Sequence, residues 1–347
     1  MLKKVLIPLL GILFLTSCGQ SGPVRPSVAG SKFEILVVMD EQPWAAEGGR
    51  ALVALLNQDM VGLPQFEPVM DIKHCTRNQF SDLLKPSRNV LVTEINPRFE
   101  RPRIVLSKNN WAQPQSVVKV EAANDSAFAA VIKNDGQRIL DYFLSTERDR
   151  QIDFNKGYVS QRMKTEIEKK FGIQIDIPTE LSKVQKGKDF MWITNDHTRI
   201  RKDLVIYSYP YTDKKTFTRE YLVAKRDSVM KANIPGEFEG SYMGTETVHL
   251  QPVYTALNLN NTYCGELKGL WKIFNGGSMG GPFYSHTRVD EINQRVITIE
   301  GFIFAPAVQK RNHIRQMEAI IYTAKLPQEI NAINEVSVVA DKKVKQE

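Results

Sequence analysis

Short apolar runs separated by polar turns recur along the chain and predict an α+β fold. The first, residues 33–39 (Phe-Glu-Ile-Leu-Val-Val-Met), is rich in β-branched and large apolar residues, which is typical of a strand. Similar runs predict strands at residues 67–72, 89–95, 103–107, 116–120, 189–194, 204–209, 283–289 and 295–304. Apolar positions at helical spacing predict helices at residues 45–58, 78–84, 124–145, 215–231 and 309–324. We therefore expect antiparallel or mixed sheets with helices packed on one face.

The order strand-strand-helix occurs three times in this prediction. The three stretches are residues 103–145, 189–231 and 283–324, and a proline, Pro210 or Pro306, follows the second strand in the last two. An internally repeated scaffold and a chance recurrence in an α+β chain both explain the order. Residue-level similarity between the stretches is not clear, so chance is the preferred interpretation.

The N-terminus has the pattern of a secretory signal peptide. Lys3 and Lys4 precede an apolar stretch too short to span a bilayer, and the stretch ends in Leu15-Thr16-Ser17-Cys18. This ending resembles a bacterial lipobox, in which the cysteine thiol is acylated with fatty acids such as palmitate and the peptide is cut before the cysteine. We expect residues 1–17 to be removed and Cys18 to carry the lipid anchor.

Composition divides the remaining chain into three parts. They are a lipidated cysteine with a Gly/Ser/Pro-containing flexible linker at residues 18–32, a globular body at 33–330 and a charged tail at 331–347. Apolar residues thin out near 177–187, which suggests two lobes at 33–180 and 181–330. After Cys18 no run approaches the roughly 20 apolar residues of a membrane-spanning helix.

The charge balance is moderately basic. Loss of Lys3 and Lys4 lowers the net charge from +7 to +5, spread over the chain. Such a charge draws a tethered protein weakly toward anionic lipids or glycans, and an envelope protein is a further possible partner. Export and the lack of a nucleic-acid-binding motif argue against nucleic acid. Cys75 and Cys264 are far apart in sequence, so a disulfide between them is undecided and two buried thiols are favoured.

One segment matches a catalytic pattern. Residues 276–280 (Gly-Gly-Ser-Met-Gly) fit the G-x-S-x-G nucleophile elbow, and Asp290 and His313 follow Ser278 in the order of an α/β-hydrolase triad. The elbow requires a helix after the serine, whereas Gly281-Pro282-Phe283 predicts a turn into another strand. A glycine-rich turn is therefore the preferred interpretation, and a serine-dependent hydrolase is the alternative.

No cofactor or metal site is predicted. The last glycine before Pro282 lacks the lysine and hydroxyl residue of a phosphate loop. The five histidines include no pair at the i, i+3 or i, i+4 spacing of a zinc helix. A metal site with ligands from positions far apart in the sequence remains an alternative.

Two further clusters stand out. Lys310, Arg311 and Arg315 lie at the start of the last predicted helix, where positive charge opposes the helix dipole. We expect internal carboxylates to hold them, with an anion site as the alternative. The aromatic residues Tyr242, Trp271 and Phe283 lie near glycines and are candidates for a groove that binds an apolar or glycan ligand, although aromatics beside glycine turns are more often core residues.

Several blocks together resemble an uncharacterised Bacteroidetes lipoprotein family, known only as a domain of unknown function. They are Gly-Ser-Tyr-Met-Gly-Thr-Glu at 240–246, Gly-Leu-Trp at 269–271, Met-Gly-Gly-Pro-Phe at 279–283 and Glu-Gly-Phe-Ile-Phe-Ala-Pro at 300–306, with Lys-Arg at 310–311 before Glu-Ala-Ile at 318–320. The resemblance implies a lipid anchor in the cell envelope but no activity. The segment after Cys18 lacks the acidic cluster associated with surface export in that phylum. The expectation is an outer-membrane lipoprotein that faces the periplasm and acts as a binding or structural module.

Overall fold

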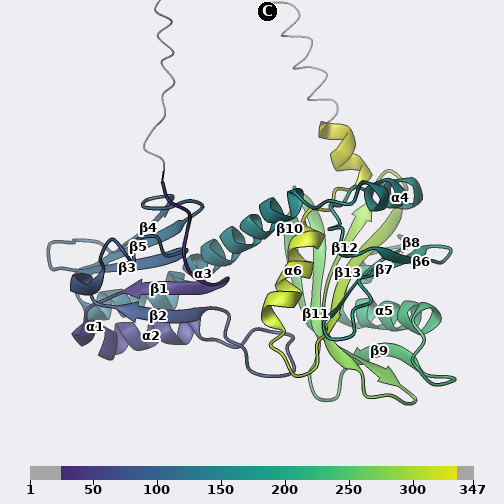
Figure 1. The fold of residues 1–347 in the computed structure, drawn as a ribbon, viewed down its shortest axis with the longest axis horizontal. Coiled ribbons are helices and arrows are strands. Elements are labelled where there is room, and N and C mark those ends of the chain that lie inside the picture. The colour runs from purple at the N-terminus through teal and green to yellow at the C-terminus, as the bar shows by residue number, and fades with distance from the viewer. Residues whose placement is uncertain (1–24, 334–347) are drawn as a thin grey trace, which may run out of the picture.

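The computed structural model describes residues 25–333 and contains two β-sheets with helices packed against them (Figure 1). The predicted signal peptide, Cys18 and the tail from residue 334 lie outside the described residues. The sheets are mixed and antiparallel, so the predicted α+β class is confirmed. Among the described residues no helix is both long and apolar enough to cross a membrane.

The first sheet is formed by the N-terminal part of the chain. Its strand order is β2-β1-β3-β5-β4, with the first four strands parallel and β4 antiparallel. The strand bounds are β1 Glu34–Val38, β2 Asp71–Cys75, β3 Asn89–Ile95, β4 Arg103–Lys108 and β5 Ser116–Ala122. Helices α1 (Glu41–Ala45) and α2 (Glu47–Leu56) follow β1, and a 3₁₀ turn η1 (Arg77–Gln79) follows β2.

The second sheet has the order β10-β11-β12-β13-β8-β7-β6, and β9 pairs with β11. All its pairs are antiparallel. The strand bounds are β6 Lys183–Lys186, β7 Phe190–Thr194, β8 Arg201–Pro210, β9 Tyr242–Glu246, β10 Val253–Leu259, β11 Thr262–Phe274, β12 Gly280–Asp290 and β13 Arg295–Phe304. The helical elements are α4 Gln161–Phe171, η2 Lys214–Phe217, α5 Arg219–Asn233 and α6 Arg311–Tyr322.

A long helix connects the two sheets. α3 (Asp125–Lys156) has 32 residues, hence about 48 Å of length, and extends from the first sheet toward the second (Figure 1). The predicted cap is confirmed, because the Asn124 side chain accepts a hydrogen bond from the backbone N–H of Ala127 at 2.9 Å. Ile35 of the first sheet, Phe143 of α3, Met317 of α6 and Ile299 of the second sheet belong to one buried core. This shared core fixes α3 against α6.

The second sheet buries both of its faces. Along β8, Leu204 and Ile206 face the shared core, whereas Val205 and Tyr207 face a separate cluster that contains Leu222 of α5. Helices therefore cover both faces of this sheet, and not one face as predicted. Continuous apolar runs such as that of β8 have no polar side, so each face requires a cover.

The three predicted strand-strand-helix units are present, as β4-β5-α3, β7-β8-α5 and β12-β13-α6. α5 and α6 nevertheless pack on opposite faces of the second sheet (Figure 1). Cys75 and Cys264 are both buried and free, as the sequence favoured.

Candidate functional site

A groove lies between α3, α6 and the segment before β1. Its main chamber has a volume of about 340 Å³ and includes Val28, Leu144, Phe154 and Asn312 in its lining. A second chamber of about 270 Å³ adjoins it and shares Lys32, Gln151, Phe154 and Gln316. We call both chambers together the α3–α6 groove. Ligand sites of proteins commonly have such volumes.

One wall of the groove contains two arginines around a single carboxylate. Arg88 donates to both Glu147 oxygens at 2.7 and 2.9 Å, and Arg150 donates to Glu147 Oε1 at 2.7 Å. The side chain of Glu147 is 1% exposed and that of Arg150 is 5% exposed. Asn89 and Ser116 from β3 and β5 complete the network through hydrogen bonds to Glu147 and Arg150. Burial lowers the pKa of Arg150, and the network keeps one positive charge in excess.

The opposite wall of the groove also has two arginines around one carboxylate. Glu318 of α6 accepts from Arg315 at 2.6 Å and from Arg148 of α3 at 3.3 Å. The Arg148 guanidinium also lies 3.7 Å from the centre of the Tyr322 ring. Burial alone would raise the pKa of Glu318, but Arg315 and Arg148 outweigh it and lower that pKa. Here too two guanidinium groups share one carboxylate.

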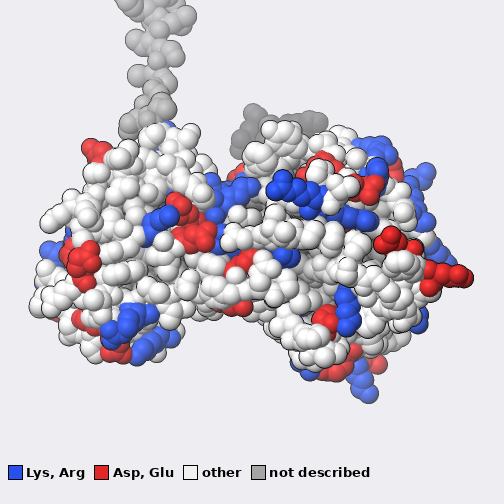
Figure 2. All heavy atoms as spheres, turned by 60° about the horizontal axis from the view of Figure 1, so that its bottom comes forward, with Lys and Arg blue, Asp and Glu red and all other residues white. Residues whose placement is uncertain are grey.

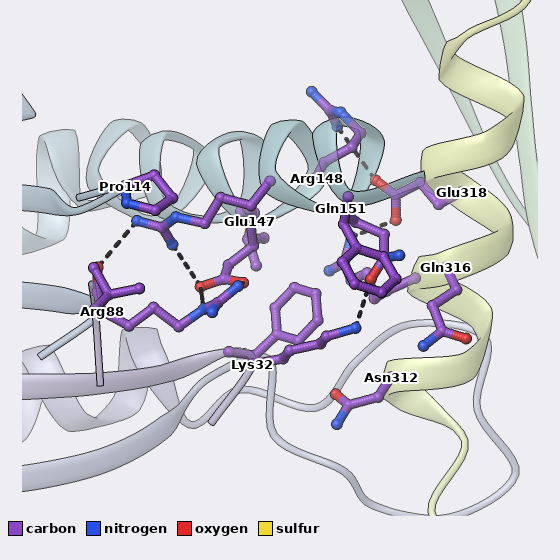
Figure 3. A pocket seen from close by; sticks show the side chains of 15 residues that line it. Lys32, Arg88, Pro114, Glu147, Arg148, Gln151, Asn312, Gln316 and Glu318 are labelled. Carbon is purple, nitrogen blue, oxygen red and sulfur yellow. Dashed lines mark hydrogen bonds and ion pairs between the residues drawn. The ribbon is translucent and has the colours of Figure 1, made fainter. Parts of the chain in front are cut away.

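Lys32 lies between the two walls. Its ammonium donates to Gln151 Oε1 at 2.6 Å, and Figure 3 shows it pointing along the groove between the Arg88–Glu147 pair and Glu318. It has no carboxylate partner among the described residues. Burial, followed by the charge of Arg88, lowers the pKa of Lys32. The ammonium is thus held in a place that disfavours its charge.

The groove therefore combines surplus positive charge with apolar surface. Five cationic side chains and two carboxylates line the main chamber, which leaves a surplus of three positive charges. The Nε atoms of Arg150 and Arg315 and the Oε1 atom of Gln316 are buried there without hydrogen-bond partners. Phe33, Leu144 and Phe154 supply apolar contact area. Such a lining can bind an anionic group attached to an apolar body.

The hydrolase-like residues do not come together. Ser278 is exposed in the turn before β12, and a strand follows it where a nucleophile elbow has a helix. Asp290 is the last residue of β12, roughly 33 Å along the strand from its start at Gly280, and it pairs with Arg295 at 2.9 Å. His313 lies half-buried on α6. Gly276 and Gly277 have φ of +118° and +92°, so this turn requires glycine for its backbone.

The three candidate groove aromatics lie mainly in the core. Trp271 and Phe283 are buried, and the Arg226 guanidinium lies 4.0 Å from the centre of the Phe283 ring. Tyr242 stacks on Phe274. They do not share a groove, although Trp271 lines a cavity of its own.

The basic cluster at the start of α6 is held internally. Arg311 donates to both Asp71 oxygens at 3.0 and 2.6 Å, and Arg315 to Glu318. Lys310 donates to Gln65 and to a backbone carbonyl. Glu67 accepts from the backbone N–H groups of Lys310 and Arg311 at 2.7 and 2.8 Å and so caps the helix. Internal pairing is confirmed for both arginines but not for Lys310.

The histidines do not form a joint site. His286 is buried beside the Tyr284 hydroxyl at 2.7 Å, His74 stacks on Trp44, and His197 and His249 lie at the surface. Within residues 25–333, no group of three or more His, Cys, Asp or Glu side chains is arranged to hold a metal ion.

Comparisons with known proteins give two adjacent matches. Residues 28–156 match a domain of unknown function (DUF8532), and residues 160–323 match another domain of unknown function (DUF4837). No curated protein matches the chain. Among solved structures, the Saccharomyces cerevisiae Ran-binding protein Mog1p covers 45% of this chain and 90% of its own, with 8% identity and a TM-score of 0.28. A Mog1 point mutant covers 44% and 90%, with 9% identity and a TM-score of 0.29.

The α3–α6 groove draws on both matched segments. Lys32, Arg88 and Glu147 lie in the first segment, and Arg315 and Glu318 lie in the second. The chain is therefore similar to two uncharacterised domains, and the α3–α6 groove is lined by residues of both matched segments.

Proposed function

We propose that this protein is a lipid-anchored, non-catalytic binding module of a bacterial envelope, and that the α3–α6 groove binds an anionic ligand with an apolar body. The observation that carries the proposal is the charge ratio of the main chamber of the groove, five cations against two carboxylates. The arginines share the two carboxylates, and the partly buried Lys32 has no carboxylate partner within residues 25–333, so the positive charges are only partly compensated. A bound phosphate or carboxylate would supply the missing counter-charge.

The polar contacts suit one anionic group held between the walls. Arg150 and Arg315 each keep an unpaired Nε–H, and Lys32 has donors beyond its bond to Gln151. Hydrogen bonds to charged groups contribute about 1.5–3 kcal/mol each. Phe33, Leu144 and Phe154 would contact the apolar part of the ligand.

The position of the groove in the chain favours a ligand taken from the membrane. Val28 lines the groove and follows Cys18 by ten residues, a distance of at most about 36 Å in an extended chain. A lipid anchor on Cys18 would keep the groove near the headgroups of an outer membrane, on its periplasmic side. Anionic lipids have the required combination of phosphate and acyl chain.

The charge distribution on one face of the molecule favours a small ligand over an extended polyanion there. On the face shown in Figure 2, Lys and Arg side chains lie in short runs between acidic and uncharged residues. Such a surface offers no continuous positive field to a polymer.

Calorimetric titration with three probes tests the proposed ligand class. Octyl phosphate has both required parts, octyl glucoside has only the chain, and inorganic phosphate has only the charge. We expect octyl phosphate to bind at least tenfold more tightly than either partial probe, because each lacks one set of contacts. Equal binding of octyl glucoside, or no binding of octyl phosphate, would contradict the proposal.

Replacement of Lys32 assigns the binding to the groove. Lys32→Gln removes one cation without touching either carboxylate, so we expect octyl phosphate affinity to fall about tenfold. Lys133→Gln is the matched control, because Lys133 is an exposed lysine on α3 that pairs with Glu47 outside the groove. Equal affinity losses in the two variants would place the binding elsewhere.

The anchor has a separate test. Cys18→Ala should abolish fatty-acid labelling and leave a folded protein, since Cys18 precedes the globular body. Acyl label that persists on the alanine variant would refute the lipobox interpretation.

A further inference from the structure

A second cavity lies on the opposite face of the large sheet, away from the α3–α6 groove. It has a volume of about 320 Å³ and opens beside the loop before β9 and the turn between β11 and β12. Trp192 of β7, Asp203 of β8, Trp271 of β11 and Phe302 of β13 line it. These side chains belong to the face covered by α5, which Figure 1 shows on the other side of the strands from α6. We call this cavity the Asp203 pocket.

Asp203 is a buried carboxylate, and one of its oxygens has no hydrogen-bond donor. Its side chain is 0% exposed. Oδ1 accepts hydrogen bonds from Trp192 Nε1 at 2.8 Å and from Arg201 Nε at 3.1 Å. Oδ2 accepts no hydrogen bond, although Arg201 Nε lies 3.1 Å away. A buried carboxylate oxygen without a donor is costly, so this atom is suited to a donor from a ligand.

The remaining walls are apolar and adaptable. Met243, Met279, Ile234 and Ile273 complete the apolar lining around the two tryptophans. Methionine side chains adjust to the shape of what they contact. The Trp271 indole N–H is already bound to the Ile303 carbonyl at 3.1 Å. The indole therefore presents ring surface to the pocket and no free donor.

The charge of the pocket is opposite to that of the groove. Arg201, Asp203 and Glu237 are its charged lining residues, which leaves one negative charge in excess. The Arg201 guanidinium lies 5.1 Å from the centre of the Trp192 ring and is paired with Asp203. A second anion would meet Asp203 and Glu237, whereas an ammonium group would supply the donor that Oδ2 lacks.

We propose that the Asp203 pocket is a second ligand site, which takes a small organic ammonium compound with an aromatic or aliphatic body. The ammonium donates to Asp203 Oδ2, and the body packs between Trp192, Trp271 and the methionines. Few polar groups line the walls, so a sugar with many hydroxyl groups would leave most of them unpaired. The proposal is independent of the function of the α3–α6 groove.

The four tryptophans allow a direct test. The full-length protein is labelled with ¹⁵N-tryptophan and titrated with 2-phenylethylamine, and the indole N–H signals are followed by NMR. Trp192 and Trp271 line the pocket, whereas Trp44 and Trp111 lie with the first sheet and its loops. We expect the signals of Trp192 and Trp271 to shift and those of Trp44 and Trp111 to stay, which also confirms that the protein remains folded.

Two matched probes and two variants complete the design. Phenylacetate and 2-phenylethanol keep the ring but replace the ammonium, and each should bind at least tenfold more weakly. Asp203→Asn should weaken amine binding roughly tenfold or more, whereas Asp153→Asn on the exposed surface of α3 should leave it unchanged. Equal binding of phenylacetate in the unaltered protein would overturn the proposal. So would an absence of Trp192 and Trp271 shifts at millimolar amine, or undiminished amine binding by folded Asp203→Asn.

Discussion

Two buried arginine–carboxylate clusters of this protein differ in their charge ratio. On the α5 side of the large sheet, Arg226 donates to Glu300 through Nε and Nη2, at 2.9 and 2.8 Å, so the two buried charges balance. Asp227 also lies 3.7 Å from Arg226 Nη1, but its side chain is 39% exposed. In the α3–α6 groove, each of Glu147 and Glu318 is shared by two arginines, and Lys32 adds a further positive charge.

The surroundings of the two clusters differ in the same way. Arg226 is 1% exposed and Glu300 0% exposed, and Thr245 and the Phe283 ring occupy the remaining sides of the guanidinium. The groove cations instead face a cavity and leave donors unused. A balanced and enclosed pair fixes the fold, whereas a surplus beside a cavity is suited to a ligand.

Removal of one member of the balanced pair should have the largest effect. Arg226→Met leaves the Glu300 carboxylate buried without a partner, and we expect the free energy of unfolding to fall by about 3–5 kcal/mol. Urea denaturation measures this loss. The double variant Arg226→Met, Glu300→Leu should regain much of the stability because no charge then remains buried. A loss below 1 kcal/mol in the single variant would mean that the pair does not fix the fold.

The pair at the start of α6 should have an intermediate effect. Arg311 is 5% exposed, but the side chain of Asp71 is 45% exposed, so solvent screens their attraction. We expect Arg311→Ala to lower the free energy of unfolding by about 1–2 kcal/mol and to leave octyl phosphate binding unchanged. If Arg311→Ala instead leaves the stability unchanged and abolishes binding to anionic lipid vesicles, this cluster is a recognition site.

The pH dependence of the groove should depend on Lys32. Because the folded pKa of Lys32 is lowered from 10.5, the free protein loses this charge at a pH where an exposed lysine keeps it. Across that range below 10.5, octyl phosphate affinity should fall as the pH rises. The stability of the free protein should rise, because the unfolded chain still binds the proton. Both steps should be absent in Lys32→Gln, and their persistence there would assign them to another group.

The smallest effect is expected at the glycine turn. Ser278→Ala should change the free energy of unfolding by less than about 0.5 kcal/mol, because the side chain is exposed. A fluorophosphonate probe should not label Ser278, since neither Asp290 nor a following helix supports a nucleophile there. Stoichiometric labelling that disappears in the alanine variant would revive the hydrolase alternative.

The local pattern of apolar and polar residues was sufficient to predict much of the fold. Residues 89–95 form β3 and residues 295–304 form β13 as predicted, because continuous β-branched runs leave little choice of structure. The helix predicted at 78–84 is only a 3₁₀ turn at Arg77–Gln79 followed by further turns. The prediction also missed α4, β6, β9, β10 and β11. β10 has mostly exposed residues, so no apolar run marks it.

The groove was much harder to predict from the sequence than the fold. Of the charged residues of its main chamber, Arg315 alone was singled out for its charge. The others come from positions 32, 88, 147, 148, 150 and 318 and meet only through the fold. The surplus of positive charge depends on which side chains the fold brings together. The order of residues along the chain does not show this. The run Glu147-Arg148-Asp149-Arg150 is the one local sign, since Glu147 and Arg150 have the i, i+3 spacing of a helical pair.

The most direct test of the central claim compares two Glu→Gln variants, one in each cluster. Glu147→Gln increases the surplus positive charge of the groove, whereas Glu300→Gln removes the buried carboxylate partner of Arg226 and leaves only the partly exposed Asp227, 3.7 Å away. Both variants should unfold at a lower temperature than the unaltered protein. The measurement is the rise in unfolding temperature on addition of octyl phosphate. The account predicts a larger rise for Glu147→Gln than for the unaltered protein and an unchanged rise for Glu300→Gln, whereas equal rises in the two variants would contradict it.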